Sequence, residues 1–163
     1  MKKLFRLIPI LFFALAMNSA LVFSQGEVRH YSLKWSGIQS VDKSGGQVVK
    51  VPSFEGAVHT SIHQFAPLFH EVISPGYDKL ISNADFKVVQ TMPLSAEELE
   101  ALRKAGFEPG NIDFSQNSAT ARGIQQLDVQ FIPVYTDASG TTVKVLKFDI
   151  VLNEETLVNN ATL

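Results

Sequence analysis

The sequence predicts a mainly β domain, an antiparallel β-sandwich or curved sheet with one short α-helix. Three observations support this class. Short apolar stretches that alternate or are β-branched recur along the chain, turn-forming clusters separate them, and a single stretch carries helix-capping signals. Strands of this kind bury one face against a second layer, which favours a sandwich. A mixed α+β arrangement is the second choice.

The first half of the chain is expected to supply several strands. Residues 27–35 (EVRHYSLKW) alternate between apolar and polar side chains, as a half-buried strand does. The turn cluster at 42–46 (DKSGG) precedes a β-branched run at 48–51, which Pro52 ends or marks as a sheet edge. Further short strands are expected at 54–62, 69–73 and 86–91.

The helix is expected at residues 96–105. Ser95 can accept from the backbone N–H three residues on, and Glu98 can reach back to Ser95, which together form a capping box. Gly106 suits the left-handed position that follows a helix. The carboxylates of Glu97, Glu98 and Glu100 lie in the first turns, where the helix dipole favours acids, so they need no catalytic explanation.

The last third is expected to hold a loop and then a β-hairpin. Residues 110–123 are polar and are predicted as a loop. Residues 125–136 and 141–152 read as two strands joined by a turn at 137–140. The buried phase of the second strand changes at Val145–Leu146, which predicts a bulge or a strand that crosses from one core to another.

The N-terminus has the pattern of a secretory signal peptide. The basic residues Lys2, Lys3 and Arg6 precede an uncharged apolar run, Leu7 to Val22. That run contains Pro9 and is shorter than the ~20 residues that span a bilayer comfortably, which argues against a permanent anchor. We therefore expect residues 1–24 to be cleaved, 25–153 to form one module, and 154–163 to be a loose tail or the start of a linker.

Charge and composition exclude several classes of function. Removing residues 1–24 leaves 11 lysines and arginines against 16 aspartates and glutamates, a net charge of −5 with no basic patch for nucleic acid. The chain contains no cysteine, so it has no disulfide, no thiol nucleophile, no thiolate metal site and no lipoprotein anchor. The export signal places the module in the periplasm, on the outer membrane surface or outside the cell.

No pattern of residues indicates an enzyme site. His59 and His63 are four residues apart and could hold zinc together, with His70 following. A zinc site needs a further protein ligand, and Glu71 or Asp78 would serve only by coincidence of folding, so exposed histidines on a β segment explain the spacing as well. The chain contains no G-x-S-x-G nucleophile elbow, phosphate loop or dinucleotide fingerprint. We therefore expect no metal, no cofactor and no catalytic residue.

Three segments carry a resemblance to a known family. In chain order they are a β segment ending in Trp35, the stretch VPSFEGAV at 51–58, and VQFIPV at 129–134 followed by LKFDI at 146–150. This series resembles the N-terminal, pro-domain-like region of the PorU-type sortase of the type IX secretion system. Such sortases are gingipain-like cysteine peptidases of Bacteroidetes, and the resemblance covers about residues 28–152. The chain departs from the family's Leu-Pro-Tyr-Tyr-like segment, where it carries Phe65 and Phe69, and it lacks the peptidase domain.

The resemblance implies a function through protein–protein contacts. In that family the exported region assists the folding of a peptidase domain and can mask its cleft, so the implied partner is a gingipain-like peptidase domain or another secretion component. Arg122, in the predicted polar loop, is the candidate residue for an Arg- or Lys-specific cleft, although an ordinary solvated arginine is the simpler interpretation. The alternative is an independent secreted β-domain that binds an extracellular ligand or wall component.

Overall fold

The computed structural model describes residues 26–43, 45–75, 79–121 and 124–156. The expected signal peptide lies outside these ranges, as does the tail from residue 157. The described chain forms one α-helix, one 3-10 turn and nine strands, in this order: β1 Val28–Ser32, β2 Trp35–Asp42, β3 Val48–Phe54, η1 Ser61–His63, β4 Phe69–Ile73, β5 Lys79–Pro93, α1 Ala96–Ala105, β6 Ser115–Ala121, β7 Ile124–Phe131, β8 Val134–Thr136 and β9 Thr142–Thr156.

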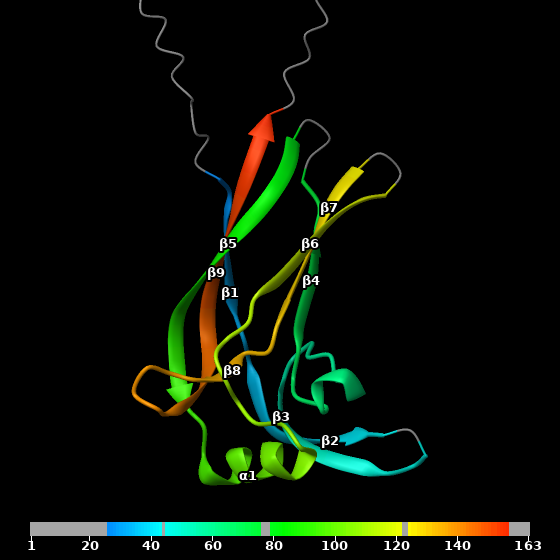
Figure 1. The fold of residues 1–163 in the computed structure, drawn as a ribbon, viewed down its shortest axis with the longest axis vertical. Helices are drawn as coiled ribbons and strands as arrows, with labels where there is room; N and C mark the ends of the chain where they lie inside the picture. Colours follow the sequence, from blue (N-terminus) through cyan, green and yellow to red (C-terminus); the bar gives the residue numbers. More distant parts are fainter. Residues whose placement is uncertain (1–25, 44, 76–78, 122–123, 157–163) are drawn as a thin grey trace, which may run out of the picture.

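The strands form three antiparallel sheets, which confirms the expected mainly β class. β9 is the centre of the first sheet, with β5 along one side and β1 and β8 along the other. The second sheet has the order β4-β7-β6, and the third is the β2–β3 hairpin. The first two sheets lie side by side in the upper half of Figure 1, and α1 and the β2–β3 hairpin lie at the lower end.

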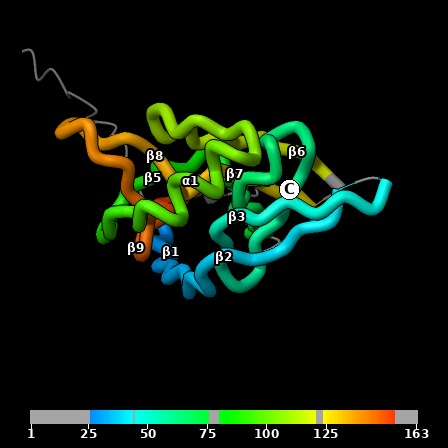
Figure 2. The backbone as a smooth tube through the Cα atoms, turned by 90° about the horizontal axis from the view of Figure 1, so that it is seen from below, coloured from blue at the N-terminus to red at the C-terminus, as the bar shows by residue number. Residues whose placement is uncertain are grey.

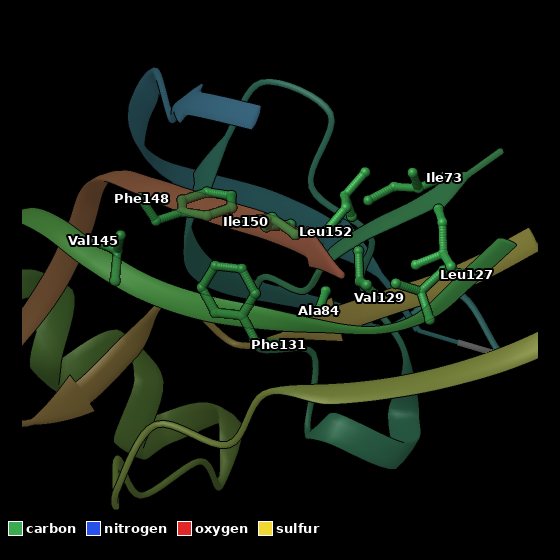
Figure 3. Close-up of a cluster of buried hydrophobic side chains, with 10 residues drawn as sticks. Ile73, Ala84, Leu127, Val129, Phe131, Val145, Phe148, Ile150 and Leu152 are labelled. Carbon is green, nitrogen blue, oxygen red and sulfur yellow. The ribbon is translucent and has the colours of Figure 1, made fainter. Parts of the chain in front are cut away.

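The main core lies between the first two sheets. It contains ten buried apolar residues, and Phe131 and Phe148 are its largest members. Their rings meet edge to face with centroids 4.9 Å apart, and Phe86 lies 4.6 Å from Phe131. Figure 3 shows β7 side chains and β9 side chains pointing into the same space. Alternation on β7 and β9 therefore supplies both faces of this aromatic core.

A double irregularity bends the first sheet. The register between β5 and β9 shifts so that Val89 on one strand and Leu146 on the other have no paired residue. Below this point Val143 and Val145 are buried, and above it the even-numbered residues Phe148 and Ile150 are buried. The bulge expected at Val145–Leu146 is confirmed, and it keeps Val145 and Phe148 in the same core although the buried phase changes between them.

Glutamine side chains join the outer edge of β5 to the second sheet. Gln116 on β6 accepts from the backbone N–H of Ala84 at 2.7 Å and donates to the carbonyl of Ala84 at 3.2 Å. Gln125 on β7 accepts from the N–H of Ile81 at 2.8 Å. These amides replace the backbone partners that an edge strand lacks, so the sheets are linked without a continuous ladder.

The sequence predicts that residues 125–136 pair with residues 141–152 as a hairpin, and this pairing is wrong for most of the first strand. β7 pairs with β4 and β6, whereas only the short β8 pairs with β9. The chain leaves the second sheet at Ile132–Pro133 and enters the first sheet at Val134. Proline lacks the N–H that a ladder needs, and Pro133 instead accepts from the N–H of Val145 at 2.9 Å.

The helix is confirmed at its expected bounds, with its capping box intact. Ser95 Oγ accepts from the N–H of Glu98 at 3.2 Å, and the Glu98 carboxylate accepts from the N–H of Ser95 at 2.9 Å. Gly106 follows in the left-handed conformation, with φ of 89°. Figure 2, seen from below, shows α1 crossing this end of the molecule beside β3.

A buried ion pair ties α1 to the first sheet. The Lys144 ammonium on β9 lies 2.5 Å from the Glu98 carboxylate, and both side chains are over nine-tenths buried. Burial would raise the pKa of Glu98, but hydrogen bonds from Lys144 and the backbone of Ser95 outweigh it and lower that pKa. Trp35 lies beside this ion pair, and its indole N–H donates to the carbonyl of Val145 at 2.8 Å.

Other expected boundaries need correction. Residues 54–62 do not form a strand, because the chain turns after Phe54 and enters a loop. Residues 115–121, expected within a polar loop, form β6, an edge strand whose only described strand partner is β7. The segment 27–35 is divided, since Trp35 begins β2 in a different sheet from β1. β9 continues to Thr156, four residues past the expected end of that strand at residue 152.

No helix among the described residues is long and apolar enough to cross a membrane.

Candidate functional site

The strongest candidate site is built around the loop of residues 55–68, which we call the FEGA loop. It begins at the end of β3 with Gly56 in the left-handed region, at φ of 83°. Val58 and Leu68 then form an isolated antiparallel bridge, with two N–H···O bonds of 2.9 Å that close the loop at its base. A long connection of this kind, closed at its ends, is usually functional rather than a plain linker.

His59 fastens the interior of the FEGA loop. Its Nδ1 lies 2.8 Å from the carbonyl oxygen of Phe65, which only accepts, so Nδ1 is the donor. Its Nε2 lies 3.0 Å from Oγ of the buried Ser53, within hydrogen-bond distance. Both ring nitrogens are therefore engaged within the protein, and a metal ion at His59 would have to displace one of these partners.

The tip of the FEGA loop is a tight and strained turn. Gln64 and Phe65 follow the 3-10 turn η1 with φ of 47° and 61°, an uncommon conformation for residues with a side chain. Thr60 accepts from the N–H of Phe65 at 2.8 Å, which holds the turn. Ala66 is fully buried beneath it, whereas Ile62 at the tip is 80% exposed. The loop thus presents a large apolar side chain on a fixed backbone.

A pocket of about 290 Å³ lies beside the FEGA loop. His63 and Leu68 line it from the loop, and the segment 107–115 and the crossing from β7 to β8 supply the other walls. The segment is fixed to β8, because the carbonyl of Gly110 accepts from the N–H of Thr136 at 2.7 Å and the carbonyl of Pro109 accepts from its hydroxyl at 3.1 Å. The pocket walls are therefore pre-organised.

A second, larger hollow separates α1 from the β2–β3 hairpin, with a volume of about 750 Å³. Its lining carries charges of both signs, namely Lys43, Lys50, Lys104, Glu97 and Glu100. Lys104 and Glu100 form an ion pair at 3.3 Å, and Lys43 lies over the ring of Phe65, 5.2 Å from its centroid. Since opposite charges meet within the hollow, its lining shows no preference for one sign of ligand.

The structure separates the residues that the sequence singled out. His63 lies in η1 and lines the smaller pocket, whereas His59 is held within the loop. His70 lies on β4, with its Nε2 3.0 Å from the carboxylate of Asp128 on β7. Among the described residues, no three histidine or acidic side chains gather as a metal site requires. Asp78 and Arg122 lie outside the described residues.

Sequence reasoning missed the exposed isoleucine and the pocket. One signal was available for Ile62, which is the lone apolar residue in the polar stretch HTSIHQ at residues 59–64. The pocket had no local signal, because its walls come from three separate segments of the chain. The sequence predicted that Glu98 belongs to the capping box of α1. It did not predict the ion pair of Glu98 with Lys144.

Comparisons with known proteins return a likeness in structure only. No family model matches the chain, and no curated protein matches it. Among solved structures, a complex of the RgpB pro- and mature domains from Porphyromonas gingivalis aligns with 13% identity and a TM-score of 0.43, covering 81% of this chain and 79% of that chain. A structure concerned with the zymogenic latency of gingipain K from Porphyromonas gingivalis aligns with 12% identity and a TM-score of 0.45, covering 78% and 93%. Neither likeness identifies a family or a partner for this chain.

Proposed function

We propose that this chain is an exported, non-catalytic module that acts through protein–protein contacts on a gingipain-like peptidase domain. In its finer form, the proposal relates the module to the N-terminal region of a PorU-type sortase of the type IX secretion system. The absence of cysteine fits a module that leaves thiol chemistry to its partner.

The residues that carry the resemblance fall into two groups in the folded chain. Most of its apolar positions are buried, among them Val51, Phe54 and Phe148, and these serve the fold. The FEGA segment itself enters the loop that carries Ile62. A partner is therefore a better explanation of this loop than packing, because its turn is held by several hydrogen bonds and yet Ile62 is 80% exposed.

The exposure of Ile62 on a fixed loop is the observation that carries the proposal. Interfaces concentrate their binding energy in a few central apolar anchors, and an anchor that is already rigid loses little conformational entropy on binding. An exposed isoleucine without a partner would gain nothing from the two hydrogen bonds of His59 and the strained turn beside it.

The first test measures binding of the chain to the peptidase domain of a PorU-type sortase, made separately. Ile62→Asp places a charge at the anchor, and we expect it to weaken binding by about tenfold or more. Met92→Asp is the matched control, because it adds the same charge at an exposed apolar residue of β5. Equal affinity of the wild type and Ile62→Asp, or equal losses in the two variants, would contradict the proposal.

Arg122 enters the same proposal as a contact with the partner's cleft. In the sequence it lies between Ala121, the last residue of β6, and Ile124, the first residue of β7. Arg122→Ala is expected to weaken inhibition of an Arg- or Lys-specific peptidase, while Arg103→Ala, on the exposed side of α1, leaves it unchanged. Inhibition that is insensitive to Arg122 removes that residue from the proposal.

Export is the remaining part of the proposal. N-terminal sequencing of the protein recovered outside the cytoplasm is expected to begin at Gln25, after removal of residues 1–24. Binding to isolated cell-wall material, combined with no binding to any gingipain-like peptidase, would favour the alternative of an independent secreted β-domain.

A further inference from the structure

We infer that the pocket beside the FEGA loop binds one lysine or arginine side chain of a partner polypeptide. Its volume of about 290 Å³ lies at the lower end of the roughly 300–1,000 Å³ that small-molecule sites occupy. A pocket of this size accommodates a single long side chain, and its two kinds of lining indicate which side chain fits.

The floor of the pocket is apolar. It is formed by Leu68 from the FEGA loop, Phe107 from the segment after α1, and residues at the crossing from β7 to β8, which are Phe131, Ile132 and Val134. Phe131 and Val134 are almost fully buried, and they belong to different hydrophobic clusters. The pocket therefore lies where the two clusters adjoin, and its floor suits the methylene stem of a long side chain.

The rim of the pocket is polar and carries negative charge. Glu108 and Asp113 lie on it with exposed side chains, and Asn111 and Gln130 add amide oxygens. None of the described residues lining the pocket is lysine or arginine. Within the described part of the chain, neither carboxylate has an ion-pair partner. An apolar floor beneath two unneutralised carboxylates is complementary to a stem that ends in an ammonium or guanidinium group.

The position of the pocket favours a polypeptide over a free amine. His63 lines the pocket and directly follows Ile62, so one turn of the FEGA loop bears both the exposed isoleucine and a wall of the pocket. A small amine would fill the pocket and leave Ile62 uncovered, whereas a polypeptide can occupy both. This inference does not require the partner to be a peptidase. Any polypeptide with an exposed basic residue beside an apolar patch could fill the pocket and cover Ile62.

The test is a titration of the ¹⁵N-labelled protein, followed by NMR, with four probes. They are the blocked tripeptide amides Gly-Arg-Gly, Gly-Lys-Gly and Gly-norleucine-Gly, and spermidine. We expect saturable shifts of the backbone amides of His63, Asn111 and Gln130 with the arginine and lysine peptides at millimolar concentrations, and at least about fivefold weaker binding of the norleucine peptide.

Two double variants locate the charge. Glu108→Gln/Asp113→Asn is expected to weaken binding of the arginine peptide by about fivefold and to reduce its dependence on salt. Glu97→Gln/Glu100→Gln removes the same charge from the other hollow and is expected to leave binding unchanged. The inference is overturned if no amide shifts saturably, if norleucine binds as well as arginine, or if the two double variants behave alike. Tighter binding of spermidine at the same amides would overturn the commitment to a polypeptide.

Discussion

The two hydrophobic clusters of this protein are held in different ways. The aromatic core between the first two sheets buries ten apolar residues, and the hydrogen bonds from Gln116 and Gln125 join the sheets at its edge. The cluster at the end that carries α1 buries only three residues, Ala66, Leu102 and Val134. There, directional bonds supply the order that packing cannot, through the Lys144–Glu98 pair, the Trp35 indole and the His59 ring.

The difference explains where the candidate site lies. A region fixed by hydrogen bonds can keep its shape while it leaves apolar atoms exposed, because its stability depends less on hiding them. Ile62 is exposed on the FEGA loop and the pocket lies where the two clusters adjoin, whereas the aromatic core encloses its own large side chains. Substitutions should therefore have different consequences in the two regions.

The largest loss of stability is expected in the aromatic core. Phe148→Ala removes a fully buried ring that contacts Tyr31, Phe69 and Phe131, and it should lower the free energy of unfolding by about 3–5 kcal/mol. Val89→Ala, at a bulge position that is 53% exposed, is the control and should change it by less than about 0.5 kcal/mol. Urea denaturation measures both, and similar losses would contradict the assignment of the core.

A loss of similar or smaller size is expected from Lys144→Met, by another mechanism. The variant leaves the Glu98 carboxylate buried without its cation, which costs about 3–5 kcal/mol at neutral pH. Replacing both partners, as in Lys144→Met/Glu98→Leu, should recover much of that loss, although it also removes the side-chain half of the capping box. A single variant as stable as the wild type at neutral pH would contradict the buried pair.

The contribution of Glu98 to stability should depend on pH in opposite directions in the wild type and in Lys144→Met. In the wild type the pKa of Glu98 is lower in the folded state than its ordinary value of 4.5, so its contribution is present above pH 4.5 and is lost as the pH falls through the folded pKa. Without Lys144, burial dominates and raises that pKa, so acid protonates the carboxyl and reduces the penalty. The stability difference between the wild type and Lys144→Met should therefore narrow below pH 4.5.

The smallest effect on global stability is expected at the FEGA loop. His59→Ala removes two hydrogen bonds and should cost about 1–2 kcal/mol. The change should be local, with faster amide hydrogen exchange at Phe65 and Leu68 and little change in the aromatic core. His63→Ala, at the pocket wall, is the control. Uniformly faster exchange over the whole protein would show that the loop is not an independent unit.

Local signals predicted the helix, whereas strand pairing depended on distant residues. The capping box of Ser95 and Glu98 and the terminal Gly106 lie within one short segment, so the sequence alone defines α1. The pairing of β7 could not be read in this way, because Pro133 diverts the chain and the partner strand β4 lies far away in the sequence. β6 was missed because its polar residues lie on an exposed edge and show no apolar alternation.

The candidate site was predictable only in part. The resemblance identified the FEGA segment, but the strained turn at Gln64 and Phe65 depends on the ring of His59 and on Ser53 from β3. Glu108 and Asp113 look like ordinary surface acids in the sequence. They become a candidate site only because the fold places them at a pocket whose floor is apolar, beside the FEGA loop.

The central claim is that this chain binds a peptidase domain through the FEGA loop and the adjoining pocket. The most direct test is amide hydrogen exchange of the protein, alone and with the peptidase domain of a PorU-type sortase. We predict slower exchange on binding, concentrated at residues 58–68 and 107–115, with little change in the strands of the aromatic core. Protection confined to other parts of the chain, or no protection at any ratio of the two proteins, would contradict the claim.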